Sequence, residues 1–175
     1  MTLTHGPRLL LLLGLFGAQS LPGAVSGDAA KPLESKDGYL KVGFDVLGAF
    51  EFSPPDTDAV PVPDALVQTA MKQVPEKIKR LDGCRVIVTG YMLPLKMNGN
   101  RVTEFLLVSS PMLCCYGVVP RMNEWVVVKT LEAGTPVLMD TPIQFYGRLH
   151  VHDLREGGMM SGIYLLDGEK MGDGT

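Results

Sequence analysis

Two adjacent cysteines, Cys114 and Cys115, are the side chains of this chain best suited to chemistry. They stand in the stretch PMLCCYGVVPRMNEW, between two runs of β-type residues. Because thiolates select zinc or Cu(I), the pair is a candidate site for either metal. The pair lacks the C-x-x-C spacing with which two thiolates close around one ion, and no thioredoxin-like pattern accompanies it.

Three other interpretations of the cysteines stay open. Cys84 could form a disulfide with Cys115, or with Cys114, that would stabilise an exported protein by about 2–4 kcal/mol. A disulfide between the two neighbours would need a strained peptide geometry. Free thiols could also be buried and pack as small hydrophobic groups. Because the chain has 3 cysteines, at least one of them is free, bound to a metal or linked to another molecule.

The residues that follow the cysteines are predicted to shape a turn. Gly117, Pro120 and Asn123 are turn-forming types, and an Asn side chain can bond the backbone of its own turn. Trp125 is the single tryptophan and is predicted to cover the core at the start of the next β-type run. Methionines near the loops could bind Cu(I) through their thioethers, although such residues more often fill gaps in a core.

His150 and His152 are further candidate metal ligands. They stand in PIQFYGRLHVHD, whose alternation predicts a strand, so their side chains share one face about 7 Å apart. Imidazole suits zinc and copper, but histidines at the end of a strand are also ordinary surface residues. A nucleophilic Cys–His site would need a cysteine within hydrogen-bond reach of one of them. Nothing in the sequence places this strand beside the two adjacent cysteines.

The N-terminus has the composition of a secretory signal peptide. One arginine precedes an apolar run from Leu9 to Ala18, and Ala24 and Ser26 form a small-residue cleavage site. The run is shorter than the roughly 20 residues that span a membrane, and an uncleaved helical anchor is the alternative. We therefore expect export to the periplasm or the extracellular space. The predicted segments are a signal peptide (1–26), an extended N-terminal arm (27–64), a β domain (65–171) and a tail (172–175).

Charge and motifs exclude several functions. Segment 1–26 holds one of the 16 basic residues and no acid, so the mature chain has 15 basic and 19 acidic residues. The basic residues form no cluster, which argues against binding nucleic acid or an anionic membrane. The motifs G-x-S-x-G, H-E-x-x-H, the P-loop and the Rossmann glycine pattern do not occur. The sequence therefore predicts a non-catalytic protein without a membrane span in its mature part.

From residue 84 onward the pattern predicts β-structure. Turn residues separate five β-type runs, and Asn98-Gly99 is a strong hairpin signal. Over 65–81, apolar spacing of three to five residues predicts one short helix or two, with Pro75 opening the second. GFDVLGAFEF (43–52) could be another strand. We expect a mainly β fold, a small five-stranded OB-like antiparallel barrel with one short helix before its first core strand, or else a sandwich. The five runs are 84–91, 103–110, 124–130, 142–153 and 161–168.

The order of these motifs resembles a bacterial family. LDGCRVIVTGYMLPL, VTEFLLVSS, CCYGVVPRMNEWVVV, GRLHV and GIYLLDGEKM follow one another over roughly residues 74–171. They are similar to secreted or lipoprotein-type proteins of unknown function, which resemble OB-like domains of membrane permeases with a Cys-containing turn. The resemblance implies an OB-like fold and export, and it carries no activity. In that family a Gly or His accompanies the Cys. This chain has no His there, and its Cys84 stands where the family varies.

Together these observations predict an exported, non-catalytic binding or accessory module. Its leading form serves an envelope transport or metal-handling system, with zinc or copper at Cys114 and Cys115 and an envelope protein or transporter as partner. The alternative is a structural protein–protein interaction domain, with a disulfide or buried thiols and no metal, whose barrel face and arm bind a partner. A thiol-dependent enzyme is the second alternative.

Overall fold

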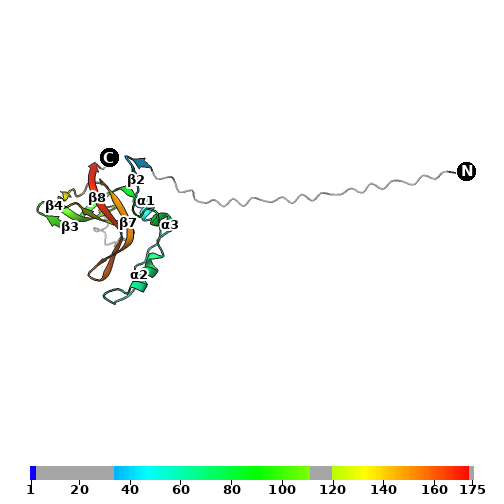
Figure 1. Cartoon of the computed structure of the whole chain (residues 1–175), viewed down its shortest axis with the longest axis horizontal. Coiled ribbons are helices and arrows are strands. Elements are labelled where there is room, and N and C mark those ends of the chain that lie inside the picture. The colour runs from blue at the N-terminus through cyan, green and yellow to red at the C-terminus, as the bar shows by residue number, and fades with distance from the viewer. Residues whose placement is uncertain (3–33, 111–119, 174–175) are drawn as a thin grey trace. The chain divides into compact units, whose positions relative to one another are not determined.

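The structure is a computed structural model that describes residues 1–2, 34–110 and 120–173. The described residues between 34 and 173 belong to one compact unit (Figure 1). The helices are α1 (Phe44–Leu47), α2 (Asp64–Met71) and α3 (Glu76–Lys79). The strands are β1 (Ser35–Lys36), β2 (Tyr39–Lys41), β3 (Arg85–Asn98), β4 (Arg101–Val108), β5 (Trp125–Thr130), β6 (Thr135–Pro136), β7 (Ile143–Glu156) and β8 (Met159–Asp173).

Five of the strands close a ring. β3 pairs with β7, β7 with β8, β8 with β5, β5 with β4, and β4 again with β3. β1 and β2 extend the sheet beside β3, and β6 extends it beside β4, so the described sheet has 8 strands. Its pairing is mixed, because β2 runs parallel to β3 and β5 runs parallel to β8.

The predicted mainly β class is confirmed, but the predicted small five-stranded antiparallel barrel is wrong. The eight strands form one mixed sheet in which the ring is only a part. β1 and β6 have 2 residues each and β2 has 3, which is too short for an alternating pattern to be visible. The sequence pattern does not reveal the parallel pairing either, because that pairing joins strands that are far apart in the chain.

Burial explains why β3 is central to the sheet. Val86, Ile87 and Val88 are 0%, 3% and 0% exposed, so both faces of the strand are covered, which fits their continuous apolar run. Val86 and Val88 belong to the main core, whereas Ile87 packs with Tyr39 and Tyr146 in a second, smaller cluster. The second cluster fixes β2 against β3 and β7.

Two hairpins follow the predicted turn residues. Asn98 pairs with Arg101 across a two-residue turn in which Gly99 has a φ of 60°, and the Asn-Gly hairpin prediction is confirmed. Gly157 and Gly158, with φ of 57° and 82°, connect β7 to β8. Positive φ values are easy only for glycine, so these glycines fix where each pair of strands turns back.

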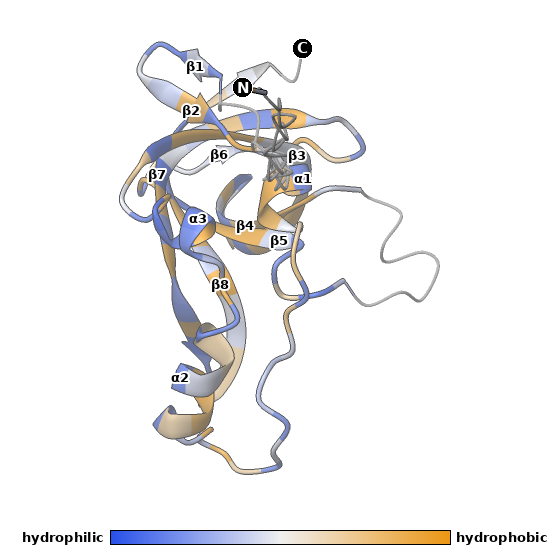
Figure 2. Ribbon diagram, turned by 90° about the vertical axis from the view of Figure 1, so that its right-hand side faces the viewer, coloured by the Kyte–Doolittle hydropathy of each residue, from blue (hydrophilic) through white to orange (hydrophobic). Residues whose placement is uncertain are grey.

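The β7–β8 hairpin extends beyond the ring and lies beside α2 (Figure 2). Arg155 of β7 binds Asp64 of α2 at 2.7 Å. At the hairpin tip, the backbone amide of Val62 donates a hydrogen bond to the carbonyl of Gly158 at 2.9 Å. The apolar side of α2 then reaches the core through Val67 and Ala70, which are 0% and 4% exposed.

The region before the sheet differs from the prediction. Three short helices precede β3, whereas one or two were predicted over 65–81, and segment 43–52 contains α1 rather than a strand. A short apolar run does not distinguish a helix from a strand, and the helical turn places Leu47 in the core at 0% exposure. Pro75 is the N-cap of α3, so the second helix predicted to open there is present.

The predicted segment boundaries stay predictions. β1, β2 and α1 lie within the range predicted to be an extended arm, and β8 continues to Asp173. Within the described part of the chain, no helix combines the length and the apolar character needed to cross a membrane. The signal peptide and its cleavage fall almost wholly on residues that the structure does not describe.

Candidate functional site

The two adjacent cysteines are not among the described residues. Cys114, Cys115 and Gly117 lie outside them, so their roles stay predictions. Cys84 is described and half-buried, and its thiol donates to the carbonyl of Arg80 at 3.4 Å. A pairing between Cys84 and either of the other two cysteines also stays a prediction.

The described residues on both sides show where the cysteine-bearing connection is attached. β4 ends at Val108 and β5 begins at Trp125, and these two residues are partners in an antiparallel pair. The chain therefore leaves the sheet and returns to it at the same end of these strands. Its return, residues 120–124, includes the predicted turn residue Pro120 and makes the contacts described next.

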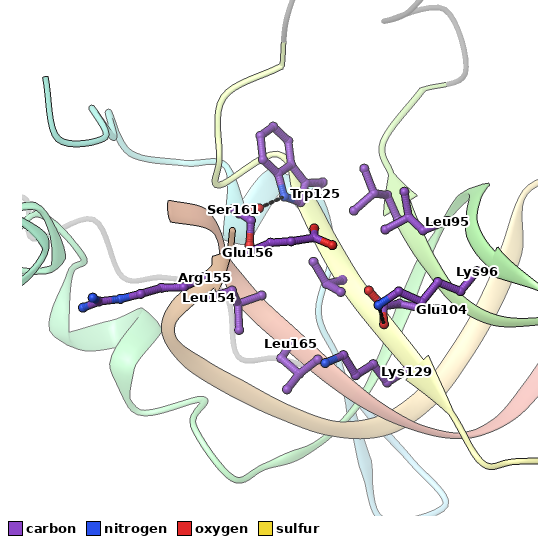
Figure 3. Close-up of a pocket in the computed structure, with 12 residues that line it drawn as sticks. Leu95, Lys96, Glu104, Trp125, Lys129, Leu154, Arg155, Glu156, Ser161 and Leu165 are labelled. Atoms are coloured by element: carbon purple, nitrogen blue, oxygen red, sulfur yellow. Dashed lines mark hydrogen bonds and ion pairs between the residues drawn. The ribbon is translucent and has the colours of Figure 1, made fainter. Parts of the chain in front are cut away.

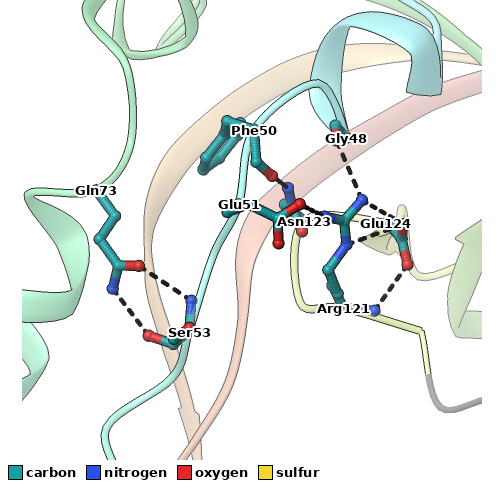
Figure 4. A network of polar contacts seen from close by, with 8 residues as sticks. All are labelled: Gly48, Phe50, Glu51, Ser53, Gln73, Arg121, Asn123 and Glu124. Carbon is teal, nitrogen blue, oxygen red and sulfur yellow. Dashed lines mark hydrogen bonds and ion pairs between the residues drawn. The ribbon is translucent and has the colours of Figure 1, made fainter.

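Arg121 ties this return to a distant part of the chain (Figure 4). Its guanidinium binds Glu124 through Nη2 at 2.8 Å and Nε at 3.1 Å, and Glu51 through Nη1 at 2.7 Å. The backbone amide of Arg121 donates to the other Glu124 oxygen, and the amide of Glu124 donates to the Arg121 carbonyl, both at 2.8 Å. We call these three residues the Arg121 clamp. Because the guanidinium already binds protein groups on several sides, we interpret Arg121 as a structural residue and not as a binding site for an anion.

Asn123 makes a second connection to the same distant segment. It is 0% exposed, and its side-chain nitrogen donates to the carbonyl of Phe50 at 2.6 Å (Figure 4). Its Oδ1 has no hydrogen-bond partner among the described residues, and a buried acceptor in that situation costs about 1–3 kcal/mol. The sequence placed Asn123 in a turn, but its long-range contact to Phe50 was not predictable from local pattern.

Segment 48–53 is held on its other side as well. The side-chain amide of Gln73 accepts from the backbone nitrogen of Ser53 at 3.1 Å and donates to its carbonyl at 2.9 Å (Figure 4). Gln73 follows α2 directly. Residues 120–124 are therefore bound to segment 48–53, which is itself bound to the region that follows α2.

The clamp also shifts the acidity of Glu124. Burial raises the pKa of this carboxyl, but hydrogen bonds from the Arg121 amide and guanidinium, with the guanidinium charge, more than offset the burial. The resulting pKa is lower than the ordinary value of 4.5. Glu124 is therefore ionised at neutral pH and carries the charge that the clamp requires.

The two predicted histidine ligands lie together on β7. Their ring centroids are 6.3 Å apart. His150 holds its Nε2 2.9 Å from Asp167 and its Nδ1 3.9 Å from Asp82, and the Nδ1 of His152 is 2.9 Å from the carbonyl oxygen of Asp153. Among the residues that the structure describes, no group of three or more His, Cys, Asp or Glu side chains is placed to hold a metal ion. Their role as ligands stays a prediction.

A groove that the sequence analysis missed lies on the face of the sheet opposite the core (Figure 3). It encloses about 400 Å³. Leu106 pairs with Val127, and Val127 pairs with Leu165, so these three side chains form a row across β4, β5 and β8. The only signal in the sequence was that these strands carry consecutive apolar residues, which indicates two covered faces. The other apolar residues of the groove are Leu95, Trp125 and Leu154.

Comparison with known proteins places most of the chain in a family. Residues 58–172 match the family described as protein of unknown function DUF3299. The crystal structure of a DUF3299 family protein from Pseudomonas aeruginosa PAO1 is similar at 25% sequence identity, with a TM-score of 0.48. The match covers 76% of this chain and 94% of that one. A search of the curated proteins found no match.

Proposed function

We propose that this chain, which belongs to the DUF3299 family of unknown function, is a non-catalytic binding module with its site in the cysteine-bearing connection. In this proposal the protein is exported and serves an envelope transport or metal-handling system. Cys114 and Cys115 bind zinc or Cu(I), and a transporter or another envelope protein is the partner. The family is described as one of unknown function, so membership does not indicate an activity.

The observation that carries the proposal is the Arg121 clamp. An ordinary connection between two strands forms without a network of ion pairs, because such loops are usually surface segments with few long-range contacts. Here Arg121 binds Glu51, 70 positions earlier in the chain, and fully buried Asn123 binds Phe50. Such fastening suits a segment whose side chains must be held in place for a ligand.

The chemistry of the pair sets the class of ligand. Two thiolates supply half of the tetrahedral coordination that zinc prefers, and thiolates are also the preferred ligands of Cu(I). In this proposal the remaining positions are filled by His150, His152, a partner protein or water. An incompletely filled coordination sphere fits a protein that passes the metal on, because it leaves room for a partner's ligand.

The proposal is tested by titrating the purified mature protein with zinc and with Cu(I) against a chromophoric chelator. A double variant, Cys114→Ser with Cys115→Ser, is compared with Cys84→Ser, because the Cys84 thiol donates to the nearby carbonyl of Arg80. We expect the wild type and Cys84→Ser to bind about one ion per chain and the double variant to lose binding, with thermal unfolding unchanged.

Two results would overturn the metal role of Cys114 and Cys115. Equal metal binding by the double variant and the wild type would move the site away from the cysteines. No binding by either protein would favour the structural interaction domain. A cysteine that labels rapidly at neutral pH without any metal would instead favour the thiol-dependent enzyme.

A further inference from the structure

The groove combines an apolar floor with charged walls, and its lining carries a positive balance. Three cationic side chains, Lys96, Lys129 and Arg155, face two anionic ones, Glu104 and Glu156, which leaves a net charge of +1. Its volume of about 400 Å³ lies within the range of about 300–1,000 Å³ that is typical of small-ligand sites.

Two of the three cations are already engaged by carboxylates. Lys96 binds Glu104 at 2.9 Å. Arg155 binds Asp153 at 2.9 Å and Asp64 at 2.7 Å. Neither side chain therefore offers a free positive charge to a ligand.

Lys129 differs from these two cations. It is exposed, and it has no hydrogen bond or ion pair with any described residue. Its neighbours across the sheet are Glu104 and Asp167, but Glu104 is bound to Lys96 and Asp167 to His150. In Figure 3 the Lys129 side chain extends toward Leu165, so its ammonium lies beside the apolar floor.

The floor itself is an apolar surface that no described helix or strand covers. Leu106, Val127 and Leu165 form its row, and Leu95 at its edge is 50% exposed. Trp125 stands at one side, and its Nε1 donates to the carbonyl of Ser161 at 3.3 Å. An apolar row with one available cation is complementary to a molecule that has an apolar body and one negative group.

We propose that this groove binds a free amphipathic monoanion, such as a medium-chain carboxylate. Its apolar body lies along Leu106, Val127 and Leu165, and its carboxylate binds the ammonium of Lys129. The proposal goes beyond the metal role argued above and does not depend on the cysteines.

The chain supplies its own reporter for this site, because Trp125 is its single tryptophan and lines the groove. The full mature protein is titrated with decanoate below the concentration at which micelles form, and tryptophan fluorescence is recorded. Decanol and decyltrimethylammonium are the neutral and cationic controls. We expect a saturable change with decanoate and much weaker responses to the other two.

Variants then separate recognition of the charge from recognition of the apolar body. Lys129→Gln should weaken decanoate binding about tenfold, since the charge-assisted contact is lost. The matched control is Lys72→Gln, because Lys72 is exposed at the end of α2 and makes no contact with a described residue through its ammonium. Leu165→Gln should weaken binding of both decanoate and decanol. Circular dichroism establishes that each variant is folded.

Three results would overturn the proposal. The first is the absence of a saturable response to decanoate. The second is a lack of charge recognition, seen either as decanol binding as tightly as decanoate or as wild-type affinity in Lys129→Gln. The third is a protein that co-purifies with the wild type and is lost from Lys129→Gln and Leu165→Gln while decanoate has no effect, which would assign the groove to a protein partner.

Discussion

Arg121 and Glu124 hold each other through both backbone and side-chain hydrogen bonds, directly after the segment that carries the two adjacent cysteines. The same guanidinium binds Glu51, which lies between α1 and α2 in sequence. This relationship fixes the point at which the connection rejoins β5. If the connection carries the binding site, loosening the clamp should weaken binding without removing the ligands themselves.

The first prediction concerns the pH dependence of the clamp. The pKa of Glu124 is lower in the folded protein than its ordinary value of 4.5, so its ionised form contributes stability above that value. The contribution is lost as the pH falls through the folded-state pKa. We expect Glu124→Gln to lower the free energy of unfolding by about 1 kcal/mol near neutral pH.

Urea unfolding at a series of pH values measures this effect. The difference between wild type and Glu124→Gln should shrink steadily below about pH 4.5. Glu132→Gln is the control, because Glu132 is exposed and has no ion pair with a described residue. A difference that stayed constant down to strongly acidic pH would show that the carboxylate charge does not contribute.

The second prediction concerns the buried amide of Asn123. Asn123→Ala removes the 2.6 Å hydrogen bond, leaves the Phe50 carbonyl without that donor and opens a cavity. The variant also removes the unpaired Oδ1, which offsets part of this cost, so we expect a net loss of about 1 kcal/mol in the free energy of unfolding. Asn100→Ala, at an exposed turn position, should change stability far less. Equal melting temperatures of Asn123→Ala and wild type would show that Asn123 does not stabilise the contact between residues 120–124 and segment 48–53.

Much of the sheet could be predicted from sequence, because alternation and turn residues are local signals. The Asn98-Gly99 hairpin and the double-sided burial of Val86, Ile87 and Val88 follow from such signals. The parallel pairing of β2 with β3 does not, since it joins Leu40 to Val86, which are far apart in the chain.

The candidate site was less predictable for the same reason. Asn123 is a recognisable turn residue, but its bond to Phe50 joins positions 73 apart. The groove depends on the register that places Leu106, Val127 and Leu165 in one row across three strands. Sequence periodicity assigns a residue to a face of its own strand, but it does not reveal which residue of the next strand lies beside it.

The third prediction concerns the close approach of β7 to β8. Gly147 is buried, and a Cβ atom there would overlap the carbonyl of Asp167 and approach Leu166 Cγ at 3.0 Å. We expect Gly147→Ala to cost about 3 kcal/mol, because the closest opposing atoms, those of the Asp167 carbonyl, belong to the backbone and cannot rotate away.

Gly99→Ala is the informative comparison for that prediction. Gly99 has open space around its Cα but a φ of 60°, so its replacement should cost about 1–2 kcal/mol through backbone strain alone. Chemical denaturation of the two variants gives the ranking. A smaller loss for Gly147→Ala than for Gly99→Ala would contradict the ring geometry.

The fourth prediction concerns the hydrogen bond that joins β8 to α1. Tyr164 is 0% exposed, its hydroxyl donates to the carbonyl of Leu47 at 3.0 Å, and burial raises its pKa. Tyr164→Phe keeps the ring but leaves that carbonyl without this donor, so we expect a loss of about 1–3 kcal/mol. Thermal unfolding tests it, and an unchanged melting temperature would show that α1 is not fixed through this contact.

The central claim, that Cys114 and Cys115 bind a soft metal, is tested most directly on mature protein purified from its export compartment. Elemental analysis and a count of free thiols are made on the same sample. We predict about one zinc or copper ion per chain, with the two adjacent thiols titrating only after chelation. The absence of metal together with a single free thiol would contradict the claim, because two of the three cysteines would then be joined in a disulfide.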